Sequence, residues 1–270
     1  MYLVDSHSHT LVSIDCKASL EAMAEGAISA GVRHFHTTDH CDLLDYDGTP
    51  VTSFPWEKAK ANFHRVKEAT DGRLELYLGV EMGSVTSAPG VARRILAEGG
   101  SEVDFVLGSA HNWVGVHDNR EMYLFDFSDP ALAQAAVATY LEQARELAWD
   151  YPDCYDSLAH LVYPLRYIRR DGGHIDLKDY PDVLHDIFTR IAATDRALEL
   201  NTWQGKDLDI WLPLLKTYRS CGGRYVTVGA DAHVPGDIGK GIPEAYELLK
   251  AAGFSAVTTF VRRQPVEHKL

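Results

Sequence analysis

The sequence predicts an α/β fold in which parallel strands close into a barrel. Short apolar runs alternate with helical patterns along the whole 270-residue chain, as they do where parallel strands are joined by helices. Histidines and carboxylates gather at the ends of these runs, and a parallel barrel brings the carboxyl ends of its strands to one face. The length suits one barrel, so we expect a single domain over residues 1–270.

Seven apolar runs are the predicted strands, since each is short and rich in aliphatic or aromatic residues. In chain order they are MYLVDSHSH (1–9), HFHTTDH (34–40), LYLGVE (76–81), VDFVLGSAH (103–111), DSLAH (156–160), LELN (198–201) and YVTVGADAH (225–233). Their spread over the whole chain means that no local helix can gather their polar ends, whereas a barrel of parallel strands can.

Helical patterns fill the segments between these runs. A helix over about 19–29 starts at Ser19, a good N-cap, and stops before Gly31, and a second over about 56–69 follows Pro55. Further helices are predicted over about 130–149, 181–195, 208–220 and 243–252. The polar stretches 41–54, 112–129 and 162–180 follow strand ends, so we expect them to be loops on the face that carries the site.

Composition excludes several classes of partner. The chain has 26 Lys and Arg against 39 Asp and Glu, and its formal net charge of −13 disfavours a long nucleic acid. A small phosphorylated substrate is compatible with this charge, because bound cations offset it locally. No apolar stretch approaches the ~18 residues of a membrane span, and Met1 leads straight into a strand, so we expect no membrane partner and no secretory signal. The four cysteines form no CxxC pair, which favours reduced thiols in a cytoplasmic protein.

The polar residues at the strand ends are metal-ligand types. His7 and His9 form a His-x-His pair on a strand, where alternate side chains point the same way, and Asp231 and His233 repeat that spacing. Glu81 ends an apolar run, where a carboxylate needs a partner or a cation. The remaining strand-end histidines are His40, His111 and His160. A lone strand-end histidine is more often structural, but the whole set indicates two or three transition-metal ions.

These motifs, taken in order, resemble those of the polymerase-and-histidinol-phosphatase (PHP) superfamily, and within it those of the monofunctional histidinol-phosphate phosphatases. The matching segments are DSHSHTLVSID (5–15), TDH (38–40), GVE (79–81), GSAH (108–111), AH (159–160), ELNT (199–202) and ADAH (230–233). The resemblance implies a distorted (β/α)7 TIM-like barrel. It also implies three divalent metal ions, zinc, manganese or iron, at the carboxyl ends of the strands.

The resemblance further implies a ligand set and a reaction. By motif position, His7, His9, Glu81 and Asp231 would hold the first ion, Glu81 would bridge to a second held by His111 and His160, and Asp15, His40 and His233 would hold the third. A hydroxide bridging two ions would attack the phosphorus of a phosphomonoester. Asp231 and His233 are our candidates for protonating the leaving alkoxide.

Substrate recognition is expected from basic residues at family positions. The resemblance implies phosphate contacts for Arg166, Lys206 and Arg262. Two departures bear on the substrate: the residues after His160 read LVYPLRY, and Lys206 is a point charge where the family has an arginine. Both leave the expected metal site unchanged.

The resemblance favours hydrolysis of L-histidinol phosphate, a reaction of histidine biosynthesis. One alternative is a PHP phosphoesterase that acts on another small phosphomonoester, a nucleotide or an oligonucleotide end. Another is a metal-binding barrel without turnover, which the presence of every expected ligand type disfavours. No feature of the sequence indicates an oligomeric state.

Overall fold

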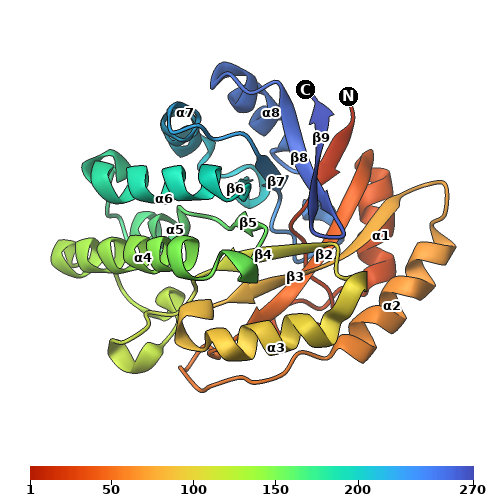
Figure 1. Cartoon of the computed structure of the whole chain (residues 1–270), viewed down its shortest axis with the longest axis horizontal. Coiled ribbons are helices and arrows are strands. Elements are labelled where there is room, and N and C mark those ends of the chain that lie inside the picture. The colour runs from red at the N-terminus through yellow and green to blue at the C-terminus, as the bar shows by residue number, and fades with distance from the viewer.

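Seven parallel strands follow one another around the sheet in chain order in the computed structural model, which describes residues 1–270 (Figure 1). They are β1 (Leu3–Asp5), β2 (Val32–Asp42), β3 (Glu75–Gly83), β4 (Phe105–Ser109), β5 (Ser157–Leu158), β6 (Ala197–Asn201) and β7 (Val226–Gly229). Strands such as β4 are buried along their whole length, which explains why they read as continuous apolar runs. The fold is therefore the distorted (β/α)7 barrel that the resemblance implied.

The barrel closes between its first and last strands. Ser6 N donates to Val228 O over 2.9 Å and Asp231 N donates to His7 O over 3.0 Å, while Ser8 and Ala232 form a parallel bridge. These contacts bring the polar ends of β1 and β7 side by side. The two ends of the chain that carry the His-x-His and Asp-x-His pairs therefore meet at one site.

Helices cover the outside of the barrel (Figure 1). They are α1 (Leu20–Ser29), α2 (Trp56–Ala69), α3 (Pro89–Gly99), α4 (Pro130–Asp150), α5 (Tyr163–Arg170), α6 (Pro181–Ala193), α7 (Trp211–Ser220) and α8 (Ile242–Ala251). In α1 the predicted N-cap is present, because the Ser19 side chain accepts from Ala22 N. None of the helices has the length and apolar character that crossing a membrane requires.

A C-terminal hairpin covers the end of the barrel where the strands begin. It consists of β8 (Ala256–Val261) and β9 (Gln264–Lys269). Phe260 packs with Phe105 in a small apolar cluster, and its carbonyl lies 2.8 Å from Nε2 of His36. In the hairpin turn, Arg262 N donates to the side chain of Asp104, just before β4. The opposite end, where the strands finish, stays open.

The structure differs from the expected elements in three segments. Residues 162–180 are not only a loop, because α5 occupies Tyr163–Arg170 and begins with Pro164 in its first turn. Helix α3 and the β8–β9 hairpin correspond to no predicted element. The other predicted helices are present, with α7 beginning at Trp211 after a short 3₁₀ turn over Leu208–Ile210.

Candidate active site

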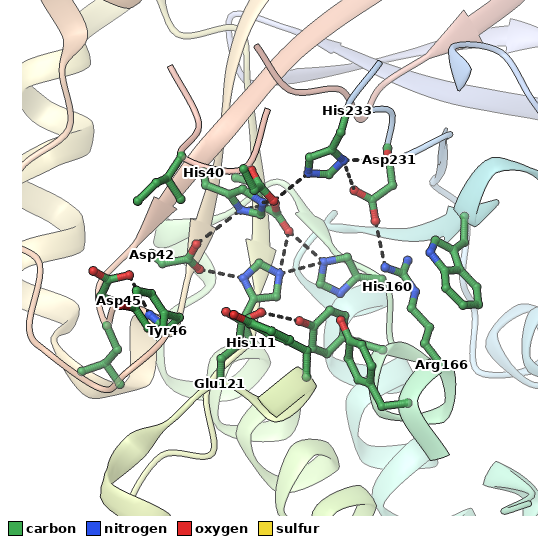
Figure 2. Close-up of a pocket in the computed structure, with 18 of the residues that line it drawn as sticks. His40, Asp42, Asp45, Tyr46, His111, Glu121, His160, Arg166, Asp231 and His233 are labelled. Carbon is green, nitrogen blue, oxygen red and sulfur yellow. Dashed lines mark hydrogen bonds and ion pairs between the residues drawn. The ribbon is translucent and has the colours of Figure 1, made fainter. Parts of the chain in front are cut away.

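The predicted metal ligands converge at the carboxyl ends of the strands (Figure 2). They surround a cavity of about 480 Å³, whose lining includes Asp15, His40, Glu81, His111, His160, Asp231 and His233. His7 and His9 lie behind this wall and are fully buried. Segments far apart in the chain thus place imidazoles and carboxylates around one open space.

Glu81 stands at the centre of the cluster. Its Oε1 lies 2.7 Å from His160 Nε2 and 3.2 Å from His111 Nε2. Its Oε2 lies 3.4 Å from His7 Nε2 and 3.0 Å from His40 Nδ1. One carboxylate therefore faces two separate groups of imidazoles, which is the arrangement a bridging ligand needs.

The other carboxylates complete the two outer groups. Asp231 Oδ1 lies 3.5 Å from His7 Nε2 and 3.4 Å from His9 Nε2. On the solvent side, Asp15 Oδ2 lies 3.4 Å from His40 Nε2 and 3.0 Å from His233 Nε2. The structure thus gathers each of the three ligand groups that the resemblance implied.

Several of these buried ligand atoms make no hydrogen bond, although other ligand atoms lie close to them, because the directions are unsuitable. They are Nε2 of His7, His9 and His233, Nδ1 of His40 and Oε2 of Glu81. Buried polar atoms are normally paired, because an unpaired one loses its hydration without compensation. Imidazole nitrogens and carboxylate oxygens are also the donors that divalent transition metals prefer. The residues present therefore fit a cluster of divalent ions.

The electrostatics of the cluster are strongly perturbed. Burial, together with the neighbouring His40 and His233, lowers the pKa of His9 to about 3, so this imidazole stays neutral. Burial opposes ionisation of Glu81, but the imidazoles of His111, His7 and His40 outweigh it and lower its pKa well below its usual range. The neighbouring carboxylates in turn raise the pKa of His7, His40 and His111, and a bound ion would displace the protons of these imidazoles.

Two of the ligands have unusual backbone conformations. His160 has φ +21° and Asp231 has φ +57°, in the region that residues with a Cβ rarely adopt. The surrounding hydrogen bonds hold both residues in place: Asp231 N donates to His7 O, and the carbonyl of His160 accepts from Tyr140 Oη over 2.9 Å. Such strain is concentrated at functional sites.

Two functional candidates escaped the sequence analysis. Asp42, at the end of β2, lies 2.7 Å from His111 Nδ1 and so orients that predicted ligand, and it also lies 3.3 Å from His40 Nδ1. Glu121 lines the cavity and accepts from Tyr163 Oη over 2.7 Å. Both residues lie in stretches expected to be loops. The sequence signal for Asp42 was its position two residues after His40, a spacing that places both side chains on one face of a strand, whereas Glu121 had no such signal.

Arg166 is the one predicted phosphate contact that the structure places in the cavity wall. It is buried, and its guanidinium lies over the rings of Tyr163 and Trp203. Nη1 donates to Asp231 and Nη2 donates to Asn201 over 2.8 Å, while Nε has no partner. The side chain is therefore held in one position beside the cluster.

The structure places the other two basic residues elsewhere. Lys206 lies against Trp203, donates to Gln204 over 3.1 Å, and lines a small hollow next to the main cavity. Arg262 sits in the β8–β9 turn at the opposite end of the barrel. The position of Arg262 corrects the expectation that it contacts the phosphate. Lys206 does not line the cavity, but it borders the hollow that Arg166 and Trp203 also line, so its phosphate contact stays a prediction.

The cavity has a second wall of carboxylates and aromatic rings. Asp45, Tyr46 and Glu121 lie on the side of the histidines away from Arg166 (Figure 2). Burial raises the pKa of Glu121, against the lowering effect of His111 and of its bond to Tyr163. This wall suits a cationic group with a planar or apolar body.

Fold and site together define an α/β-barrel protein with an imidazole–carboxylate cluster at the end of the barrel where such enzymes carry out their chemistry. Comparison with known proteins identifies the family. The PHP domain family model matches residues 5–203, so the chain belongs to the PHP domain family.

Named relatives extend over almost the whole chain. The histidinol-phosphatase of Lactococcus lactis is 25% identical over 265 residues, which cover 96% of this chain and 95% of the relative. A protein of Thermotoga maritima named "probable histidinol-phosphatase" is 29% identical over 257 residues, 93% of each chain. The crystal structure of histidinol phosphate phosphatase from Lactococcus lactis, complexed with zinc, L-histidinol and phosphate, superimposes with a TM-score of 0.84, 22% identity and 98% coverage of both chains.

Proposed function

We propose that this protein is a metal-dependent phosphomonoesterase that hydrolyses L-histidinol phosphate to L-histidinol and phosphate. The observation that carries the proposal is the convergence of the imidazoles and carboxylates of three ligand groups around one cavity. The relatives named histidinol-phosphatase match this chain over nearly its full length, and one related structure holds zinc, L-histidinol and phosphate. We take residues 1–270 as one phosphoesterase domain.

The chain would hold three divalent ions, which we propose to be zinc, manganese or iron. His7, His9, Glu81 and Asp231 would hold the first, Glu81, His111 and His160 the second, and Asp15, His40 and His233 the third. Divalent ions lower the pKa of water toward ~7 and neutralise phosphate oxygens as charge develops on them. The chain's own contribution is to fix these donors in a buried cluster.

Two groups of this chain act on the phosphate end of the substrate. Arg166, held between Tyr163 and Trp203, supplies a fixed positive charge beside the cluster. Asp231 and His233 line the cavity beside the cluster, and we propose one of them as the group that returns a proton to the leaving oxygen. Because Asp231 is ionised at rest, it would first have to take that proton from the attacking water. Because the positive charge and the proton donor are in place before the reaction, the activation free energy of hydrolysis is lower in this site than in water.

The second wall accounts for the organic part of the substrate. L-Histidinol phosphate carries an amine and an imidazole, both of which bear positive charge when protonated. Glu121, Asp45 and the ring of Tyr46 face the cavity at a distance from Arg166 and offer carboxylates and an aromatic face to such groups. A nucleoside monophosphate would instead place its uncharged sugar and base against these carboxylates and offer them no cation. The wall therefore favours the amino alcohol ester over the nucleotide alternative.

A substrate panel tests the proposal. Zinc-, manganese- and iron-loaded enzyme would be assayed for phosphate release from L-histidinol phosphate, a nucleoside monophosphate and an uncharged small phosphomonoester. We expect kcat/KM for L-histidinol phosphate to exceed the others by at least about a hundredfold, because esters without its amine and imidazole leave the carboxylates of the second wall unpaired. A preference for either of the other esters would replace the proposed substrate.

The four free thiols also support a reducing compartment, so we propose that the reaction takes place in the cytoplasm.

A further inference from the structure

Strand β6 differs from its neighbours because no predicted metal ligand stands at its end. Instead it carries Glu199 and Asn201, two residues apart and both buried. Alternate residues of a strand share one face, so both side chains point to the same side as the cluster. A buried carboxylate that holds no ion must be paired, and its partners indicate its role.

The first partner of Glu199 is His7 of the β1 end. Glu199 Oε1 lies 2.6 Å from His7 Nδ1. A carboxylate can only accept, so Nδ1 carries a proton, which leaves Nε2 as the nitrogen that can present a lone pair to an ion. That Nε2 faces the cluster, 3.4 Å from Glu81 Oε2 and 3.5 Å from Asp231 Oδ1. Glu199 thus selects the tautomer of His7 that can bind an ion.

The second partner is the backbone of His160, which follows β5. Glu199 Oε2 accepts from His160 N over 2.7 Å. This is the residue with φ +21°, and its carbonyl is held on the other side by Tyr140. The strained peptide carries an imidazole whose Nε2 lies 2.7 Å from Glu81 Oε1. The second oxygen of the same carboxylate therefore fixes a second predicted ligand.

The space around the pair is shaped for it. Gly229 of β7 lies against both side chains: a Cβ there would clash with the Cβ of His7 and come within 3.1 Å of Glu199 Oε1. Asn201 Nδ2 lies 3.3 Å from Glu199 Oε2, and Asn201 Oδ1 accepts from Arg166. Glu199 is thus tied to the cavity wall as well as to the ligands.

We propose that Glu199 is a positioning residue of the metal centre. It holds His7 in its Nδ1-protonated form and His160 in its strained backbone conformation, so that ligands from the first and fifth strands face Glu81 together. The proposal rests on the proposed metal-dependent function. The proposal adds to that function a residue that binds no ion itself but controls how tightly the cluster binds its ions.

Replacement of Glu199 by Gln tests the proposal. Gln is nearly isosteric but has one accepting oxygen, so it can satisfy His7 Nδ1 or His160 N but not both. We expect the affinity for zinc, measured by competition with a chromophoric chelator, to fall 10–100-fold in E199Q, as is typical when the hydrogen-bond partner of a metal ligand is lost. Wild-type zinc affinity and stoichiometry in E199Q would overturn the proposal.

Asp156→Asn provides the matched control. Asp156 is also a buried carboxylate that accepts from a backbone N–H, that of Val106, and it pairs with Arg196 and Arg263 at the start of the strands, away from the cluster. We expect D156N to lower thermal stability without altering zinc affinity. Equal losses of zinc affinity in the two variants would show that Glu199 is only structural and would overturn the proposal.

A measurement on the unmutated, zinc-loaded protein avoids any folding defect. Long-range ¹H–¹⁵N NMR assigns the proton of each imidazole to one of its nitrogens. We expect His7 to carry its proton on Nδ1, and a proton on Nε2 with a bare Nδ1 would contradict the proposal. These tests need no substrate. If the wild-type enzyme binds zinc but leaves L-histidinol phosphate intact, the proposed function fails, and the role of Glu199 is decided by zinc affinity alone.

Discussion

Arg166 and Asp231 form a buried ion pair in the cavity wall, with Nη1 donating to Oδ2 over 2.9 Å. Burial opposes ionisation of Asp231, but His7 and Arg166 outweigh it and lower its pKa well below the usual range. The guanidinium therefore has two roles: it keeps Asp231 ionised within the cluster and offers positive charge to the phosphate. Its pairing with Asn201 and its two aromatic neighbours fix it for both.

Replacement of Arg166 by Lys separates charge from geometry. A lysine ammonium is a point charge and cannot reproduce the planar fork that bonds Asp231 and Asn201 together. We expect R166K to lower kcat/KM at least about tenfold, a loss of roughly 1.4 kcal/mol of transition-state stabilisation, and R166A to lower it further. Arg169→Lys is the control on the same helix, because Arg169 pairs with Asp207 and Asp209 outside the cavity. Full activity in R166K would contradict this account.

Replacement of Asp42 by Asn tests the orientation of His111. Asp42 Oδ1 lies 2.7 Å from His111 Nδ1, and the amide of Asn can present a donor to that nitrogen instead of an acceptor. We expect the zinc affinity of D42N to fall about 10–100-fold in titrations of the metal-free protein. The exposed Asp47→Asn should leave that affinity unchanged. The same affinity in both variants would remove Asp42 from the site.

Replacement of Glu121 by Gln tests recognition of the amine and imidazole. Gln keeps the size and the bond to Tyr163 but removes the charge. We expect KM for L-histidinol phosphate to rise about tenfold, the worth of one charge-assisted hydrogen bond, while KM for an uncharged phosphomonoester stays the same. An equal rise for both esters would mean that Glu121 shapes the cavity without reading charge.

The identity of the proton donor can be tested with leaving groups. An alkoxide needs protonation to depart, whereas an aryl oxide leaves readily without it. We expect Asp231→Asn or His233→Gln, whichever removes the donor, to slow hydrolysis of L-histidinol phosphate far more than that of an aryl phosphate. Equal slowing of both esters by both variants would show that neither residue protonates the leaving group.

Stability should depend on pH through His36 at the far end of the barrel. Burial lowers the pKa of His36 to about 4, although the hydrogen bond to the Phe260 carbonyl acts to raise it. The other ionisable groups that face His36 are His268 and His34, whose Nε2 lies 3.5 Å from that of His36. Between about pH 6.5 and 4, His36 is protonated in the unfolded chain but not in the folded chain. The free energy of unfolding is therefore highest above pH 6.5 and decreases as the pH falls toward 4.

The size of this effect can be measured by urea unfolding of metal-free wild type and His36→Gln. The shift in pKa corresponds to up to about 3 kcal/mol at pH 4. We expect the stability of His36→Gln to decline less steeply between pH 6.5 and 4, because all other histidines are common to both proteins. Parallel curves would contradict the account of His36.

The strands and their ligands could be predicted from sequence because both signals are local. An apolar run that ends in His40 or Glu81 predicts that this residue lies at the carboxyl end of its strand, where the site is. Once the strands are parallel, those ends meet regardless of how far apart they lie in the chain. The positions of His111, His160 and Asp231 around Glu81 follow from the same rule.

The missed features depend on tertiary packing. Helix α5 is only eight residues long, three of them arginines, and Pro164 stands in its first turn, so from sequence it resembles a loop. Glu121 reaches the cavity only because the loop after β4 folds back, with Glu121 N donating to Tyr46 O. Arg262 was placed near the phosphate by resemblance, whereas the hairpin carries it to the opposite end of the barrel. In each case the decisive contact lies between segments distant in the sequence.

The most direct test of the central claim is phosphate release from L-histidinol phosphate by chelator-stripped protein titrated with zinc, with bound metal counted per chain. The convergence of His7, Glu81 and Asp231 predicts that stripped protein is inactive and that activity rises in step with bound zinc. Full activity without metal, or zinc bound at the cluster with no phosphate released, would contradict it.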